Sequence, residues 1–310
     1  MSSNLAFLSK ERARTGVGNQ IINPTSFEDA IQQAGLDWTV NFHDVYADVG
    51  DSHILVPNVQ AVVRDEDSKT LGIVSDRYRI INNSEAFAFT SSIFDSNEIT
   101  FERGGSYRGG RATWIQAKVT TEYSILGDDT TCYIILLNTH DGSGSIKALI
   151  MPTRIVCSNA LNFALNHASR IWRCPHTQDI SARVNEAREF LLNGTNYMKA
   201  LEEEAERLNK KKLSETEVES MVSFLFPILP DATERIKKAR QETREQFLTV
   251  YKEKEDLQNF DQNAYRFLSA VVDYVAHRDL PKKTETGNLN RYLNIAQGNP
   301  LIDKAYNLVK

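Results

Sequence analysis

The side chains best suited to binding chemistry gather between Phe101 and His176. This stretch holds eight Lys or Arg against five Asp or Glu, a local charge of +3 in a chain whose net charge is −5. Cations interleaved with aromatic rings are typical of a surface that contacts a phosphate backbone and stacks on bases. The candidate binding residues are Arg103, Tyr107, Arg108, Arg111, Lys147, Arg154, Arg170, Trp172, Arg173 and His176.

Catalytic and metal chemistry find less support in the same stretch. Cys157, Cys174, His140 and His176 could be zinc ligands, but only Cys174 and His176 are closely spaced, whereas structural zinc sites use paired ligands at short spacing. A nucleophile–base pair of Cys157 and His176 has no known local signature around it. The scattered acids form no carboxylate cluster for Mg²⁺. We therefore predict no catalytic residues, no metal, no cofactor and no enzymatic activity.

Two segments allow both a structural and a functional interpretation. The glycine-rich run Gly104–Gly110 lacks the ending of a Walker phosphate loop and is typical of a hairpin turn, or of a flexible basic loop around Tyr107. The run Arg170–His176 is expected to leave a helix that starts near Ser158. Its arginines could interact favourably with the negative C-terminal end of the helix dipole, or they could bind a ligand.

Composition places the chain among ordinary folded proteins. It has 310 residues, of which 41% are hydrophobic and 25% charged. Three cysteines without a CxxC pair favour a reducing compartment, and the first residues lack the apolar segment of a secretory signal. No apolar run reaches the roughly 18 residues of a membrane span. We expect a cytoplasmic protein of a bacterial host cell, with no membrane partner.

These residues must be positioned by an α+β fold. Residues 1–20 are expected to be a flexible tail, 21–180 an α+β domain with an antiparallel sheet, and 181–310 a helical domain. The first domain should be a β-meander and hairpins packed on helices, with a β-β-β-α core, followed by an all-α C-terminal half. Strands are expected at 54–57, 59–64, 71–75, 78–81, 99–103 and 111–119, and helices at 27–34, 84–94, 184–208, 260–277 and 300–309, with capping-box starts at Ser214–Glu217 and Asp231–Glu234.

Five motifs, in chain order, resemble those of one known family. They are Leu71–Tyr78 with Asn83–Phe87, Gly104–Arg111, Asn138–Gly142, Pro152–Asn159 with His176–Thr177, and Asp273–Arg278. Together they resemble the phage- and plasmid-like proteins that carry the domain of unknown function 932, over residues 34–309. Ala276 stands where the family motif has an acid, and the segment Ser158–Ala160 also departs from it. The resemblance implies a role in mobile elements and no established activity.

A second, fold-level resemblance concerns architecture alone. Three antiparallel strands with a basic hairpin, followed by a helix, are similar to the core of the Rad fifty-two and lambda Red beta single-strand annealing proteins. That resemblance implies a ring that holds single-stranded DNA in a basic groove. The expected helix departs from this pattern, because residues 157–169 carry no Lys or Arg.

From these observations we expect a phage-associated protein that binds single-stranded nucleic acid and anneals or protects strands in recombination or replication. An alternative is a non-enzymatic interaction or inhibitory protein that contacts a host or phage protein through acidic helices, Glu202–Glu206 and Glu242–Asp256. We also expect a homo-oligomer, of which a ring is one form, because exposed strand edges must be covered.

Overall fold

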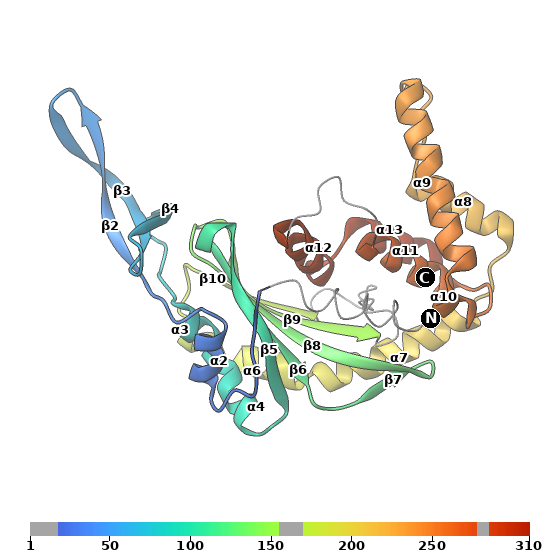
Figure 1. The fold of residues 1–310 in the computed structure, drawn as a ribbon, viewed down its shortest axis with the longest axis horizontal. Coiled ribbons are helices and arrows are strands. Elements are labelled where there is room, and N and C mark those ends of the chain that lie inside the picture. Colours follow the sequence, from blue (N-terminus) through green and yellow to red (C-terminus); the bar gives the residue numbers. More distant parts are fainter. Residues whose placement is uncertain (1–17, 155–169, 278–284) are drawn as a thin grey trace.

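A long antiparallel sheet forms the centre of the molecule (Figure 1). The computed structural model describes residues 18–154, 170–277 and 285–310. The strand order is β1-β5-β6-β8-β9-β10, with β7 paired to β8. The strands are β1 (Asn19–Gln20), β5 (Ile99–Tyr107), β6 (Ala112–Val119), β7 (Tyr123–Ile125), β8 (Asp128–Thr139), β9 (Ser145–Arg154) and β10 (Ile171–Pro175). The fold is α+β, as the sequence predicts.

Strand β8 is buried on both faces of this sheet. Its residues 130–138 are all buried, because a nearly unbroken apolar run suits a central strand that is covered from both sides. Alternate side chains enter different cores: Ile135 and Leu137 point to one face, and Ile134 and Leu136 to the other. The sheet is therefore the middle layer of three.

Short N-terminal helices cover the lower face of the sheet in Figure 1. Phe27 of α2 packs against Phe101 of β5, with ring centroids 6.0 Å apart. The same core includes Ile115, Leu136 and Trp172. The elements on this face are α2 (Phe27–Gln33), α3 (Asn83–Phe87), the 3₁₀ turn η1 (Ala88–Thr90), α4 (Ser91–Asp95), a second 3₁₀ turn η3 (Ser181–Arg183) and α6 (Val184–Leu192).

The C-terminal helices cover the upper face and close the right-hand end (Figure 1). Tyr292 of α12 packs on Trp114 of β6, and its hydroxyl donates to Oε1 of Gln116 at 2.5 Å. The sheet and the helices thus share one large core. These helices are α8 (Glu215–Leu225), α9 (Glu234–Glu253), α10 (Glu255–Gln258), α11 (Ala264–His277), α12 (Glu285–Gln297) and α13 (Pro300–Val309). Helix α7 (Gly194–Lys210) instead runs beneath the sheet in Figure 1, where Gly194 lies near Ile150 of β9. Of the helices that the structure describes, none is long and apolar enough to cross a membrane.

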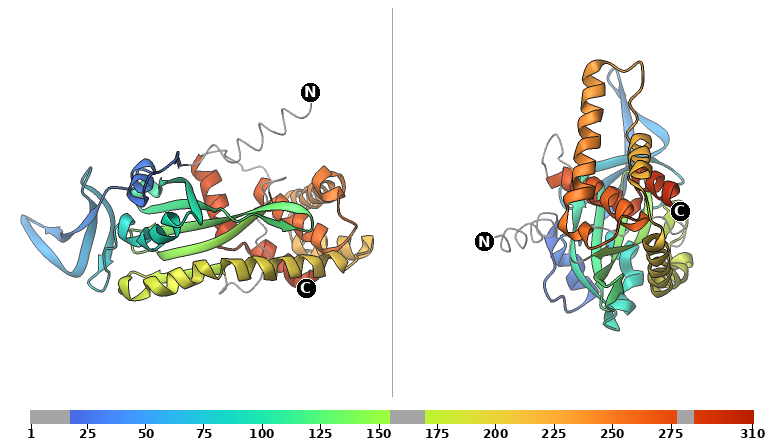
Figure 2. Two further views of the ribbon diagram at one scale, coloured as in Figure 1. Left: turned by 90° about the horizontal axis from the view of Figure 1, so that it is seen from below. Right: turned by 90° about the vertical axis from the view of Figure 1, so that its right-hand side faces the viewer.

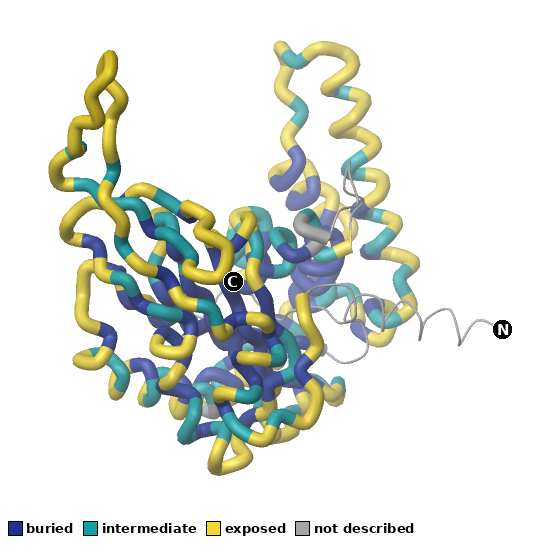
Figure 3. The backbone as a smooth tube through the Cα atoms, turned by 60° about the vertical axis from the view of Figure 1, so that its left-hand side comes forward, coloured by how far each residue is buried: buried dark blue, intermediate teal, exposed yellow. Residues whose placement is uncertain are grey.

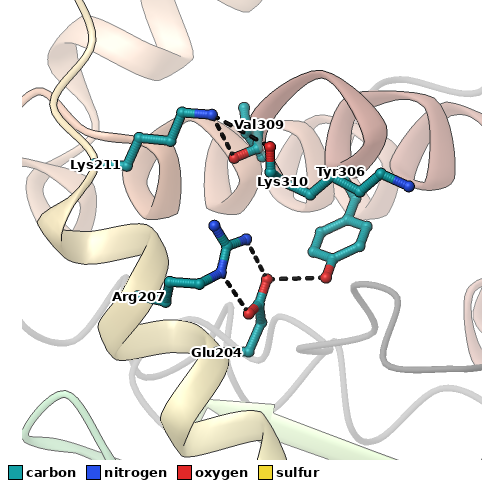
Figure 4. Close-up of polar contacts among 6 residues, drawn as sticks. All are labelled: Glu204, Arg207, Lys211, Tyr306, Val309 and Lys310. Carbon is teal, nitrogen blue, oxygen red and sulfur yellow. Dashed lines mark hydrogen bonds and ion pairs between the residues drawn. The ribbon is translucent and has the colours of Figure 1, made fainter.

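Polar contacts fasten α13 to α7 (Figure 4). The Glu204 carboxylate accepts from the guanidinium of Arg207 at 2.6 and 2.8 Å and from the Tyr306 hydroxyl at 2.8 Å. The Lys211 ammonium donates to the backbone oxygens of Val309 and Lys310. Because the Lys211 contact satisfies carbonyls at the end of α13, it favours a fixed position for that helix.

A separate three-stranded sheet extends from the other end of the molecule (Figure 1). Its strands are β2 (Val40–Val49), β3 (Ser52–Arg64) and β4 (Lys69–Ser75), in that order. Gly72 of β4 lies against the turn after β8, where a Cβ would come within 2.6 Å of the Asp141 backbone. Only a residue without a side chain permits this approach, so Gly72 fixes where the small sheet docks.

Three features of the predicted elements differ in the structure. The predicted turn at Gly104–Gly110 is shorter in the structure. Gly104 and Gly105 lie inside β5, and the turn consists of the 3₁₀ segment η2 (Arg108–Gly110). Residues 171–175, which we expected only as the run after a helix end, form the strand β10, which pairs with β9. Residues 78–81 form no strand. The predicted helix after Ser158 falls outside the described residues, as does Cys157.

The two predicted capping boxes differ in outcome. The Ser214 side chain accepts from the Glu217 backbone, and the Glu217 carboxylate accepts in return from the backbone N–H of Ser214. Thr233 is the N-cap of α9 but makes no side-chain cap hydrogen bond.

We expect the ion pair of Lys254 with the buried Asp273 to stabilise the helical half. Asp273 exposes 5% of its side chain and Lys254 29%, so Lys254→Met leaves a buried carboxylate without its ammonium partner and should cost about 2–3 kcal/mol in unfolding free energy. Lys210→Met, at the exposed Glu206 pair, should cost under about 1 kcal/mol. Urea denaturation measures both. Equal losses would contradict this assignment, and adding Asp273→Leu to Lys254→Met should restore most of the stability.

Candidate nucleic-acid interface

Two cations lie directly opposite one another on neighbouring strands. Lys147 of β9 pairs in register with Arg173 of β10, and the same row continues through Leu137 of β8 to Trp114 of β6. Residues in one such row point to one face of the sheet, here the upper face, where α12 lies. The Lys147 ammonium donates to Oε1 of Gln297 at 2.6 Å, while the Arg173 side chain is exposed.

The end of β5 adds a third cation and an aromatic ring. Arg108 is exposed, and its guanidinium lies 5.6 Å from the centre of the half-buried Tyr107 ring. Burial lowers the pKa of Lys147, and the positive charges of Arg173 and Arg108 lower it further. The three cations are therefore close enough to repel one another.

The small sheet contributes Arg64 and Lys69 to the same end. A Cβ on Gly110 would lie 2.9 Å from a guanidinium nitrogen of Arg64, and one on Gly109 would lie 2.9 Å from the Lys69 ammonium. Arg64 forms an ion pair with Asp67 at 2.6 Å, and Lys69 interacts electrostatically with the same carboxylate. Gly109 and Gly110 have positive φ angles of 71° and 92°, which glycine adopts without strain.

We call these residues the sheet-end cluster. It comprises Arg64, Lys69, Arg108, Arg111, Lys147 and Arg173 with the ring of Tyr107. Within the described residues three carboxylates lie near these six cations, Glu66, Asp67 and Asp141, which leaves a surplus of three positive charges. Like charges opposite one another on paired strands destabilise a sheet. An anion that binds here would relieve that repulsion, so the arrangement suits several phosphate groups.

Three of the predicted binding residues are wrong for this surface, because their side chains are interior. Trp172 points to the lower face, packs on Phe89 with ring centroids 5.6 Å apart, and is 7% exposed. Arg170 is 2% exposed, and burial lowers its pKa. His176 is 3% exposed. A stacking or phosphate contact needs an accessible side chain, so these residues stabilise the fold instead.

The remaining candidates lie at different distances along the sheet. Arg111 is exposed and directly follows η2, beside the cluster. Arg103 is half-buried, four residues before Tyr107 on β5, and interacts electrostatically with Tyr292. Arg154 pairs in register with Thr130, at the opposite end of β9 from Lys147, and its side chain is outside the described part of the structure.

On the lower face, behind the sheet-end cluster, lies a buried polar network that our sequence analysis did not identify. Oδ1 of Asn83 accepts from the Thr113 hydroxyl at 2.8 Å and from Nε2 of His140 at 2.9 Å. Its amide donates to the Leu36 carbonyl, and the Asn138 amide donates to the Ile81 carbonyl. The network therefore joins α3 to the ends of β6 and β8.

A stacked pair of rings extends this network. His176 stacks on Tyr78 with ring centroids 4.7 Å apart, and the Tyr78 hydroxyl donates to the Thr139 carbonyl at 2.9 Å. Burial lowers the pKa of His140 to about 3, and the nearby His176 makes a smaller contribution in the same direction. Burial also lowers the pKa of His176. Both rings are therefore neutral at physiological pH. The signal available in the sequence was that the network residues Asn83, Asn138, His140 and His176 all lie within the family motifs.

The two described cysteines are poor nucleophiles. Cys132 and Cys174 are free and buried, and burial raises the pKa of Cys132 to about 12 and also raises that of Cys174. Thiols become reactive as thiolates, so burial makes both side chains inert. Among the described residues, no group of three or more His, Cys, Asp or Glu side chains could hold a metal ion.

The sequence of this chain matches one known protein family. The family described as a domain of unknown function (DUF932) matches residues 70–296. The chain belongs to this family. The matched segment starts in β4 and ends in α12, so it contains the polar network from Tyr78 to His176 and most of the sheet-end cluster, whereas β2 and β3 precede it. No curated protein and no solved structure matched the chain significantly.

We expect His140 to make the stability of this DUF932 protein depend on pH. Its pKa is about 3 in the folded chain against an ordinary 6.5, so the unfolded chain binds one more proton between these values. Stability should therefore fall as pH drops below 6.5, by up to about 1.4 kcal/mol per pH unit from this group. His140→Gln keeps a donor for Asn83 and should flatten the slope.

Urea denaturation at about pH 7, 6 and 5 measures the dependence of the unfolding free energy on pH for both proteins. His43→Gln, at an exposed position of β2, is the matched control and should retain the full slope. A slope for His140→Gln that equals that of the unsubstituted chain would contradict the prediction.

Proposed function

We propose that the chain binds single-stranded nucleic acid at the sheet-end cluster. The observation that carries the proposal is the position of Lys147 and Arg173, directly opposite one another and close to Arg108, in a chain with a net charge of −5. An acidic protein that concentrates cations at one place keeps a repulsion that only an anionic ligand relieves. A phosphate backbone supplies such charges at regular spacing.

The composition of the cluster favours a single strand over a duplex. A stacking ring, Tyr107, lies within the cation set, and bases stack on aromatic rings only where they are not already paired in a duplex. The cations come from β3, β4, β9, β10, η2 and the residue after η2, and none comes from an α-helix that could enter a major groove. Stacking would contribute about 1–3 kcal/mol per base, with little sequence preference.

The biological role that we propose is strand annealing or protection in phage recombination or replication. Annealing requires that a backbone be held while the base edges stay accessible to a second strand. A cluster that contacts phosphates and stacks on one base leaves those edges free. The phage context rests on the resemblance noted in the motifs.

The acidic helices offer less support for the alternative, an inhibitory protein that docks through negative charge. Glu204 is bound by Arg207 and Tyr306, Glu206 by Lys210, and Asp256 lies 3.9 Å from the Lys254 ammonium. Carboxylates that are already paired within the chain present a weaker field to a partner. We therefore place nucleic-acid binding first.

The expected result of Arg108→Ala combined with Arg173→Ala is weaker binding with a flatter salt dependence. Each phosphate contact to a single strand contributes about 0.7 to the slope of log K against log salt, so the double variant should lose about 1.4. Because both side chains are exposed, its thermal stability should stay nearly unchanged. Fluorescence anisotropy with a labelled oligonucleotide at several salt concentrations measures the slope.

The matched control is Lys118→Ala combined with Lys199→Ala. It removes two exposed cations, one of them near the opposite end of β6, and should leave the slope unchanged. If unsubstituted protein does not bind at low salt, or if both double variants lose the same slope, the cluster is not the binding site.

A further inference from the structure

Two arms project from the same side of the molecule, at opposite ends of its long axis (Figures 1 and 2). We call residues 45–56, at the tip of β2 and β3, the hairpin arm, and residues 224–240, from the end of α8 into α9, the helical arm. Both are largely exposed (Figure 3). Exposed elements of this length need a partner to bury their apolar side chains.

The hairpin arm is a two-stranded ribbon that exposes both apolar side chains and carboxylates. Tyr46 and Leu55 pair in register and are 54% and 51% exposed, and Val49 and Ile54 are 59% and 51% exposed. Beyond the shift in register after Asp44 the arm has two strands, because β4 pairs only with residues 59–64 of β3. A two-stranded ribbon is marginally stable alone. Asp48 and Asp51 give the arm two negative charges and it contains no Lys or Arg.

The helical arm carries apolar side chains of similar exposure and the opposite charge. Phe224, Leu229 and Ile236 are 63%, 59% and 51% exposed. Its four cations, Arg235, Lys237, Lys238 and Arg240, exceed its two carboxylates, Asp231 and Glu234, by two charges. The surplus equals the negative charge of the hairpin arm.

We propose that the hairpin arm of one chain docks on the helical arm of a second copy of this chain. The occupant is identified by complementary charge and by apolar side chains on both arms. Because the arms of one chain lie at opposite ends, the contact joins different copies.

Such a contact uses two different surfaces and is therefore head-to-tail. Repetition of a head-to-tail contact produces a closed ring or an open filament. The proposal goes beyond nucleic-acid binding and does not depend on it. Both arms rise on the side of the sheet that carries Lys147 and Arg173, so an assembly would place successive sheet-end clusters on related faces.

Light scattering of the full chain from about 1 to about 100 micromolar tests the proposal. The unsubstituted chain should exceed its monomer mass of 35.1 kDa. Tyr46→Ser with Leu55→Ser, and separately Phe224→Ser with Ile236→Ser, should each weaken association by about tenfold or more. Leu192→Ser, at an exposed position of α6, is the matched control and should associate normally.

Mixing the two double variants distinguishes a head-to-tail contact from a symmetric one. Each variant keeps the arm that the other lacks, so an equimolar mixture should form a dimer and stop there. A mixture that stays monomeric, or loss of association in only one of the two double variants, would overturn the proposal. So would a monomeric unsubstituted chain at every concentration.

A charge exchange separates docking from misfolding. Asp48→Lys with Asp51→Lys should weaken association, and so should Arg235→Glu with Lys238→Glu. All four substitutions in one chain should restore it, because the attraction is reversed in sign on both arms. Failure of the combined variant to associate, with an unchanged circular dichroism spectrum, would also overturn the proposal.

Discussion

The burial of β8 on both faces is the constraint on which the rest of the structure depends. A strand that is buried from Thr130 to Asn138, with an apolar run from Cys132 to Leu137, is stable only when each face is covered. The chain supplies one cover from its N-terminal helices and another from its C-terminal helices. Tyr292 shows how closely the second cover is fitted, since its ring packs on Trp114 while its hydroxyl satisfies Gln116. The two halves of the chain are therefore packed on one sheet.

Because both faces are covered, polar function is confined to the ends of the strands. Lys147 and Arg173 lie at one such end on the upper face, and Asn83, Asn138 and His140 lie behind them on the lower face. The two groups have different physical roles. The network is neutral, buried and largely satisfied, which fixes the strand ends in place. The cluster is charged and partly exposed, and it keeps a repulsion that a ligand can relieve.

The pattern of residues predicted the fold class and much of the helical half, because these depend on local periodicity and capping. The Ser214 capping box is one example. The position of a side chain relative to the two faces was harder to predict. Trp172 and Arg173 are neighbours in the sequence, yet one enters the lower core and the other is exposed, because alternate residues of a strand point to opposite faces. Because we expected residues 170–176 to follow the end of a helix, we did not interpret them as a strand with side chains on alternate faces. The contribution of Arg64 could not be predicted either, since it depends on how the small sheet docks through Gly72.

The docking of the small sheet connects the cluster with the neutral network. Gly72 lies against Asp141, which directly follows His140, and the backbone N–H of His140 donates to the carbonyl of Arg111. A disturbance of the network at His140 would therefore reach both the β5–β6 turn and the contact that places Arg64 and Lys69. Such coupling does not require a moving part, because the same short backbone segment supports both sets of side chains. It also explains why a network without a charge or a reactive group lies behind a surface suited to phosphate: it holds cations together at a spacing that they would not adopt on flexible loops.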